Sequence, residues 1–248
     1  MIKTITSPIN PLIKHVVKLH SSKHRTELQE FIAEGFRTIS TIIKAGHQPI
    51  ILFTVDEFLY DAQQLVADEL IIVITPSVME KISTAQSPSG LLATFHIPPQ
   101  SSLTTLSSGV VLAQVTDPGN MGTLIRTAAA MNKKAVICVE TVDPWNPKVI
   151  QATAGAIGNV SIFRLNWNEI VQNKKNIPLY ALVPSEGKHP NHVNLHDALI
   201  VVGSESHGIP EEWIEQCDEK ITLPMPGNFE SLNAAVAGSI ALYLSAAQ

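Results

Sequence analysis

Short apolar runs alternate with helix-like stretches through the second half of this 248-residue chain, and this alternation restricts the fold more than any other feature of the sequence. The candidate strands are 110–115, 135–140, 160–165, 179–183, 199–203 and 221–223. The candidate helices lie near 122–132, 147–158, 209–216 and 230–246. Because strands that are apolar throughout must be covered on both faces, the pattern predicts an α/β fold with a parallel sheet between two helical layers.

The first half predicts a smaller α/β unit. A helical pattern runs from residue 8 to about residue 45, and it is followed by strand candidates at 50–53, 69–74 and 91–95. The segment after them is rich in proline and serine, which is typical of a linker. We therefore expect one domain over residues 1–97, a linker over 98–108 and a second domain over 109–248.

The charge of the chain is uneven. The net charge is −5, but residues 1–48 carry +4 and the remainder carries −9. A basic surface of this kind can hold a nucleic-acid backbone, although ordinary solvated helix faces explain it equally well. Cys138 and Cys217 form no Cys-x-x-Cys pair, and the histidines of the loop 189–196 are not expected to converge, so neither a disulfide framework nor a metal site is predicted. With no secretory signal or membrane span predicted, we expect a cytoplasmic protein.

Ligands of parallel sheets bind at the carboxyl ends of the strands, and three loops are predicted there. The first, TDPGNMGTLIRTA over residues 116–128, turns into a helix that Asn120 is expected to cap. It contains neither the Gly-x-Gly-x-x-Gly of dinucleotide-binding folds nor a phosphate-cradling Gly-Lys-Ser/Thr. Arg126 has small apolar neighbours, so an anion or another partner is expected beside it.

The second loop is VVGSESHGIPEEW, over residues 201–213. It comes close to the Gly-x-Ser-x-Gly of hydrolases, but the first glycine is missing and no later histidine completes a triad. Two interpretations stay open. Either Ser206 caps an ordinary acidic loop into a helix, or Glu205 is a buried acid that faces Arg126 across the strand ends.

The third loop begins ITLPMPGNFESLN at residue 221 and continues into an alanine-rich helix. The LPMPG segment offers a stiff backbone with apolar side chains, which suits the enclosure of a flat ring. Ser231 and Asn233 stand where the helix opens. Small residues recur four apart at Ala237, Ala241 and Ser245, so the helix can pack closely against its own chain or against a second subunit.

Together the three segments resemble the motifs of the SpoU (TrmH-like) family of RNA ribose 2′-O-methyltransferases, in the SPOUT superfamily. DPGNMGTLIRTA, LIVVGSESHGIP and ITLPMPGNFESLNAAVAGSIALY occur in the family's order across about residues 110–247. The first half, including STAQSPSGLLATF, is similar to the RNA substrate-binding domain with a ribosomal-protein-like α/β fold that many members carry. The resemblance implies a C-terminal trefoil knot, a homodimer with its site at the interface, and a structured RNA substrate, ribosomal rather than transfer RNA.

The resemblance also implies a cofactor and a set of site residues. S-adenosylmethionine would bind in the knot, with its adenine held by the backbone around Gly203, Leu223 and Leu232 and with Ile221, Met225 and Ser231 nearby. The implied catalytic residues are Asn120, Arg126, Glu205, Ser231 and Asn233. The family mechanism gives Arg126 the proton of the ribose hydroxyl, whereas binding of the adjacent phosphate accounts for its position equally well, since arginine is hard to deprotonate. The alternative function is a non-catalytic RNA-binding or assembly factor that keeps the fold.

Overall fold

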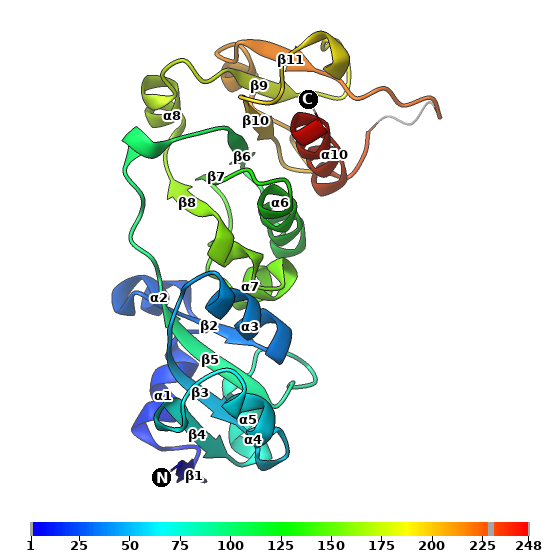
Figure 1. Cartoon of the computed structure of the whole chain (residues 1–248). Coiled ribbons are helices and arrows are strands. Elements are labelled where there is room, and N and C mark those ends of the chain that lie inside the picture. Colours follow the sequence, from blue (N-terminus) through cyan, green and yellow to red (C-terminus); the bar gives the residue numbers. More distant parts are fainter. Residues whose placement is uncertain (1, 228–230, 248) are drawn as a thin grey trace. The chain divides into compact units, whose positions relative to one another are not determined.

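The structure is a computed structural model that describes residues 2–227 and 231–247, and its contacts divide the chain into two units (Figure 1). Unit 1 contains Met1–Pro99 and Trp145–Gly158. Unit 2 contains Gln100–Pro144 and Asn159–Gln248. The segment Trp145–Gly158 thus belongs to unit 1, although the sequence places it among the strands of the second half. The chain passes between the units three times, and the domain boundaries set from the sequence stay a prediction.

Unit 1 is built on a sheet of strand order β1-β4-β3-β5-β2, in which β5 runs antiparallel to both of its neighbours (Figure 1). The strands are β1 (Lys3–Ile5), β2 (Glu30–Glu34), β3 (Pro49–Thr54), β4 (Ile71–Ile74) and β5 (Leu91–His96). The α-helices of this unit are α1 (Pro11–Lys18), α2 (Ser22–Leu28), α3 (Phe36–Lys44), α4 (Leu59–Gln63), α5 (Pro76–Ile82) and α7 (Pro147–Thr153).

Strand β2 shows that the helical pattern predicted from residue 8 to residue 45 is wrong in its middle. Gln29 follows α2 in the left-handed conformation, with φ of 53°, and Gly35, with φ of 88°, separates β2 from α3. Between them Phe31, Ile32 and Ala33 are all buried, because β2 pairs with β5. Sheet pairing and burial decide the structure of this segment over its local pattern.

Helix α7 packs against β2 and α3 of unit 1. Trp145, just before the helix, packs against Phe31 with ring centroids 4.9 Å apart and the ring planes tilted by 38°. Val149 and Ile150 are fully buried. After the helix, Gly155 has φ of 85°, and a Cβ built on it would lie 2.4 Å from the carbonyl oxygen of Thr38. The segment is therefore fitted closely to unit 1.

Unit 2 contains a sheet of order β11-β9-β10-β6-β7-β8, and all of its strand pairs are parallel. Its strands are β6 (Gly109–Ala113), β7 (Ala135–Val139), β8 (Ser161–Arg164), β9 (Leu179–Leu182), β10 (Leu199–Val202) and β11 (Glu219–Ile221). Its α-helices are α6 (Pro118–Ala130), α8 (Trp167–Asn173), α9 (Glu211–Ile214) and α10 (Ala234–Ala247). The predicted parallel α/β fold is confirmed, and the trefoil knot stays a prediction. None of the helices in the described residues has the length and apolar character to cross a bilayer.

Helices cover both faces of this sheet. On one face α10 packs against α6 and β10, and a Cβ built on Gly238 would lie 2.5 Å from Leu124 and 2.9 Å from Val202. On the other face α8 and α9 bring Trp167 and Trp213 into a stack with centroids 4.9 Å apart. Helix α8 was not predicted, although the pattern Asn166-x-x-Glu forms a capping box at its start.

The far end of α10 is held by a buried lysine. Lys133, 4% exposed, donates through Nζ to the carbonyl oxygens of His196 at 2.6 Å and Ser245 at 3.3 Å. Burial lowers the pKa of this ammonium group, and Asp197 partly opposes the shift. A cation at the C-terminal carbonyls of a helix stabilises it, so Lys133 fixes α10 on unit 2.

Candidate cofactor pocket and active site

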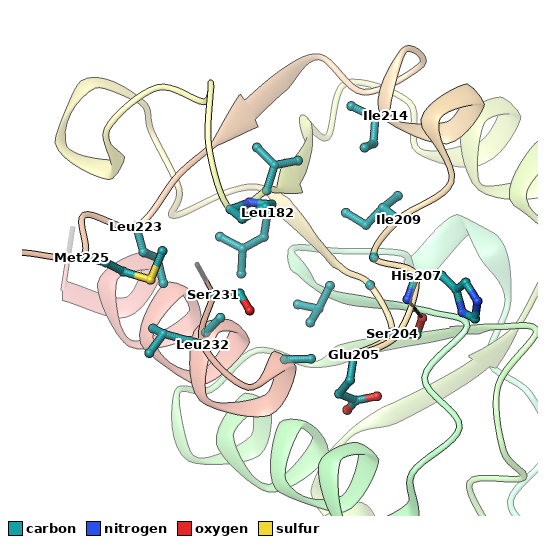
Figure 2. Close-up of a pocket in the computed structure, with 17 residues that line it drawn as sticks. Leu182, Ser204, Glu205, His207, Ile209, Ile214, Leu223, Met225, Ser231 and Leu232 are labelled. Atoms are coloured by element: carbon teal, nitrogen blue, oxygen red, sulfur yellow. Dashed lines mark hydrogen bonds between the residues drawn. The ribbon is translucent and has the colours of Figure 1, made fainter. Parts of the chain in front are cut away.

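A cavity of about 390 Å³ lies at the carboxyl edge of the sheet of unit 2 (Figure 2). Its lining comes from the ends of β9 and β10, the loop between β10 and α9, the last residue of α9, the chain after β11 and the first turn of α10. The lining residues are Leu182, Val183, Pro184, Val202, Gly203, Ser204, Glu205, His207, Gly208, Ile209, Ile214, Leu223, Met225, Ser231, Leu232, Ala234 and Ala237. This volume is in the range of small-molecule sites.

The first motif supplies a polar side chain beside this cavity. Asp117 caps α6, because its Oδ1 accepts a hydrogen bond from the backbone N–H of Asn120 at 2.8 Å and Pro118 takes the first helical position. The expectation that Asn120 caps the helix is therefore wrong. Its side chain is instead free to donate through Nδ2 to the carboxylate of Glu205 in the second motif.

The third motif joins the same network. Asn233 donates through Nδ2 to Oδ1 of Asn120, at 3.3 Å. Its own Oδ1 accepts from the backbone N–H groups of Ala235 at 2.9 Å and Val236 at 3.2 Å, so it also caps the start of α10. One chain of hydrogen bonds, Glu205–Asn120–Asn233, thus brings together three segments that are far apart in the sequence. Residues 228–230 of the third motif lie outside the described residues.

The second motif forms a closed loop after β10. The backbone N–H of Ser204 donates to the Gly208 carbonyl at 3.1 Å, and the Gly208 N–H donates back to Ser204 at 2.9 Å. A Cβ on Gly203 would lie 2.3 Å from the carbonyl carbon of Gly208, so the loop can close only on a glycine. Glu205, Ser206 and His207 form the tip of this loop.

The expected pair of Glu205 with Arg126 is not present. Glu205 is exposed rather than buried, and its carboxylate binds Asn120. Arg126 lies on the exposed face of α6, is absent from the lining of the cavity and makes no hydrogen bond or ion pair with another described residue. Six residues along a helix amount to a rotation of about 240° beyond one full turn, so Asn120 and Arg126 leave α6 in different directions.

The residues expected at the cofactor fall into two groups. Gly203, Leu223, Met225, Ser231 and Leu232 line the cavity. Ile221 does not, because it is buried in a small core with Tyr180 and Leu195. The lining segment Leu182–Pro184 was missed, although the end of a parallel strand is where a ligand is expected.

The lining is compatible with S-adenosylmethionine. Leu182, Leu223, Met225 and Leu232 provide apolar walls for an adenine ring (Figure 2), and the buried Gly203 also lines the cavity. Ser231 and Glu205 add polar groups at the same cavity. A flat base needs such apolar faces with a few fixed polar groups, and the lining provides both.

The described residues contain no group of three or more His, Cys, Asp and Glu side chains placed to hold a metal ion. The rings of His189 and His192 have centroids 5.6 Å apart. His196 turns elsewhere, because its Nδ1 bonds the carbonyl oxygen of Ser245 at 3.2 Å.

Comparison with known proteins gives consistent results over the whole chain. The model of the SpoU rRNA Methylase family matches residues 107–243, and that of the MRM3-like substrate binding domain matches residues 10–93. The 23S rRNA (guanosine(2553)-2′-O)-methyltransferase RlmP of Bacillus subtilis (strain 168) is 28% identical over 250 residues, covering 97% of this chain and 98% of the relative.

Two solved structures agree closely with the fold. The AdoMet-bound rRNA methyltransferase from Sinorhizobium meliloti has a TM-score of 0.85 at 27% identity, and the match covers 98% of this chain and 97% of that one. The crystal structure of an RNA 2′-O ribose methyltransferase has a TM-score of 0.81 at 29% identity with the same coverage. Since the family model spans more than half of the sequence and includes all three motifs of the site, the chain belongs to the SpoU rRNA methylase family.

Proposed function

We propose that this protein transfers a methyl group from S-adenosylmethionine to a ribose 2′-oxygen of ribosomal RNA, of the 23S type. The observation that carries the proposal is the hydrogen-bond chain Glu205–Asn120–Asn233, which joins the three family motifs beside the cavity. The similarity to the RlmP methyltransferase of Bacillus subtilis, whose name specifies 23S rRNA, favours that substrate. A cytoplasmic location belongs to the same proposal.

We assign the residues around the cavity to the tasks of the reaction, which are to bind the cofactor, to align the ribose and to assist loss of its proton. When bound, S-adenosylmethionine supplies an already activated methyl group, so the protein has mainly to align the ribose oxygen with it and to assist loss of the hydroxyl proton. We place the ribose beside the amides of Asn120 and Asn233, which are held in one hydrogen-bond chain with Glu205. We assign Arg126 to the phosphate beside the target ribose, because a guanidinium group stays protonated and matches phosphate geometry.

We further propose that the protein acts as a homodimer. Val236, Ile240 and Tyr243 form an apolar stripe on α10 with exposed fractions of 47%, 39% and 60%. Their spacing of four and three residues places them on one helix face, which a second copy would cover. In that dimer the exposed Arg126 of one subunit is available to the cavity of the other.

Unit 1 is proposed to hold the RNA. Lys14, Lys18 and Lys23 are exposed on α1 and α2, as a phosphate-binding surface requires. Arg25 has a different role, because it is 1% exposed and donates to the carbonyl oxygens of Leu19 and His20, at 2.8 and 2.9 Å. The positive charge that the first helices can offer to RNA phosphates is therefore smaller than the sequence indicates.

The reaction is tested by incubating the protein with labelled S-adenosylmethionine and in vitro transcripts of 23S rRNA, 16S rRNA and tRNA. We expect label at a ribose 2′-oxygen of the 23S transcript alone. Absence of label from all three, together with no calorimetric signal for S-adenosylmethionine binding, would favour the alternative of an RNA-binding assembly factor. Label on tRNA alone would contradict the substrate.

The shared site is tested by mixing two inactive variants, Arg126→Ala and Glu205→Ala. If each cavity takes Arg126 from the partner subunit, mixed dimers contain one complete site, and random exchange restores roughly a quarter of the wild-type rate. If Arg126 serves its own cavity, no mixed dimer has a complete site and the mixture stays inactive. Each variant is first shown to be dimeric by light scattering.

A further inference from the structure

The tip of the closed loop Ser204–Gly208 carries a histidine that the proposed reaction does not use. His207 is exposed and lines the cavity, so it stands at the rim. Its backbone N–H donates to the hydroxyl of the buried Ser204 at 3.3 Å. Because the loop is also closed by the two backbone hydrogen bonds between Ser204 and Gly208, the position of His207 is fixed by the backbone.

The ring of His207 is oriented by its neighbour. The hydroxyl of Ser206 lies 2.8 Å from Nδ1, whereas Nε2 has no hydrogen-bond partner among the described residues. With Ser206 as the donor, Nδ1 accepts and Nε2 carries the proton, so the ring presents one N–H group outwards. No described acid forms an ion pair with the ring, since the adjacent Glu205 is bound to Asn120.

The direction of the ring separates it from the cofactor residues. Figure 2 shows Glu205 and His207 leaving the loop on different sides, with the imidazole turned away from the apolar walls at Leu182, Leu223 and Leu232. An exposed group at the rim that is turned away from the cofactor walls is accessible to a molecule that enters from outside, which in the proposed reaction is the RNA.

We propose that Nε2 of His207 donates a hydrogen bond to a phosphate oxygen of the RNA next to the methylated ribose, and that Ser206 orients the ring for this contact. The inference rests on the proposed function. A single outward N–H fits a phosphate oxygen, because base edges are read mainly by paired donors and acceptors. The contact therefore positions the substrate and leaves the choice of nucleotide unchanged.

The test uses the full-length protein and a 23S rRNA transcript. For His207→Ala we expect the KM for RNA, and the Kd for RNA measured by filter binding, to rise about tenfold, as for loss of one hydrogen bond to a charged group. The kcat at saturating RNA, the calorimetric Kd for S-adenosylmethionine and the methylated position stay as in the wild type. His207→Gln, whose amide donates in the same region, recovers part of the loss.

Two further variants make the test specific. Ser206→Ala keeps the imidazole but frees its rotation, so the KM for RNA rises about threefold. His192→Ala, an exposed histidine outside the cavity, changes none of these quantities. The inference is overturned if His207→Ala leaves KM and Kd for RNA within twofold, if kcat falls instead, or if cofactor affinity falls equally. If the wild type binds the transcript but transfers no methyl group, the proposed function fails while the binding measurement still decides the role of His207.

Discussion

Asn233 has two roles that substitution can separate. Its Oδ1 caps α10, and its Nδ2 donates to Asn120 in the hydrogen-bond chain. We expect Asn233→Ala to lower the stability by about 1 kcal/mol, the usual value of an N-cap, and to reduce methyl transfer as well. Asn233→Ser keeps a capping oxygen but cannot reach Asn120, so its thermal midpoint stays near that of the wild type while kcat falls. If the two variants have the same kcat as the wild type, the link to Asn120 has no part in the reaction.

The proposed role of Arg126 can also be tested by substitutions at that one residue. Because it lies outside the lining of the cavity, Arg126→Ala should leave the calorimetric affinity for S-adenosylmethionine unchanged. Because we propose that Arg126 binds the phosphate beside the target ribose, its loss should misplace the reacting oxygen, and we expect methyl transfer to the 23S transcript to fall by about 100-fold. Arg126→Lys keeps the charge but loses the paired donors, so it should be only partly active. If the alanine variant is fully active, Arg126 has no part in the reaction.

The sequence predicted which residues belong to the candidate site better than it predicted which of their side chains contact one another. The motif pattern identified Asn120, Glu205 and Asn233, and the structure joins all three. It did not predict that Glu205 binds Asn120 rather than Arg126, because this depends on which helix face each side chain takes. The roles assigned to Ser231 and Arg126 stay predictions.

Within α10, the packing of one glycine connects the helix to the cavity. A Cβ on Gly238 would meet Leu124 of α6 and Val202 of β10, and Val202 lines the cavity. We expect Gly238→Ala to lower the stability by about 1–3 kcal/mol through overpacking and to weaken cofactor binding by displacing Val202. Thermal unfolding and calorimetry measure the two effects. Ala246→Ser, on the exposed end of the same helix, is the control and should change neither.

The elements themselves were predictable to different degrees. Five of the six strands of unit 2 were identified, because a strand buried on both faces reads as a continuous apolar run. The sixth, β11, begins with Glu219 and Lys220 and shares only Ile221 with the predicted strand 221–223. Strand β2 was missed because its short apolar segment fits a helical pattern until its pairing with β5 is known. Helix α7 was predicted as a helix, but its place on unit 1 was not, since nothing in its local sequence specifies which surface buries it.

At the scale of the whole molecule, the chain of unit 2 is interrupted by the segment Trp145–Gly158, which is folded into unit 1. A truncated protein of residues 100–248 retains α7 but lacks β2 and α3, against which α7 packs. Trp145, Val149 and Ile150 would then be exposed to water. We expect this protein to aggregate or to unfold with low cooperativity in thermal and light-scattering measurements.

A second truncation distinguishes this cause from a general instability of unit 2. When residues 145–158 of the shortened protein are replaced by a glycine-serine linker, the exposed apolar surface is removed while the sheet of unit 2 stays complete. We expect this version to be monodisperse or dimeric and to bind S-adenosylmethionine, without efficient methylation of the RNA. If the unmodified truncation is already well folded, the burial of α7 in unit 1 contributes little to stability.

Helix α7 is packed in unit 1, although the chain before and after its segment belongs to unit 2, and this arrangement predicts the outcome of limited proteolysis. A protease that cuts once between residues 98 and 108 breaks the polypeptide, but the C-terminal fragment still carries the helix that is buried in the N-terminal one. The two fragments should therefore elute together from a sizing column and part only in denaturant. A nicked linker would therefore not release the half that we propose to hold the RNA, and the proposed RNA binding and methyl transfer would stay in one particle as long as that one helix remains folded in place.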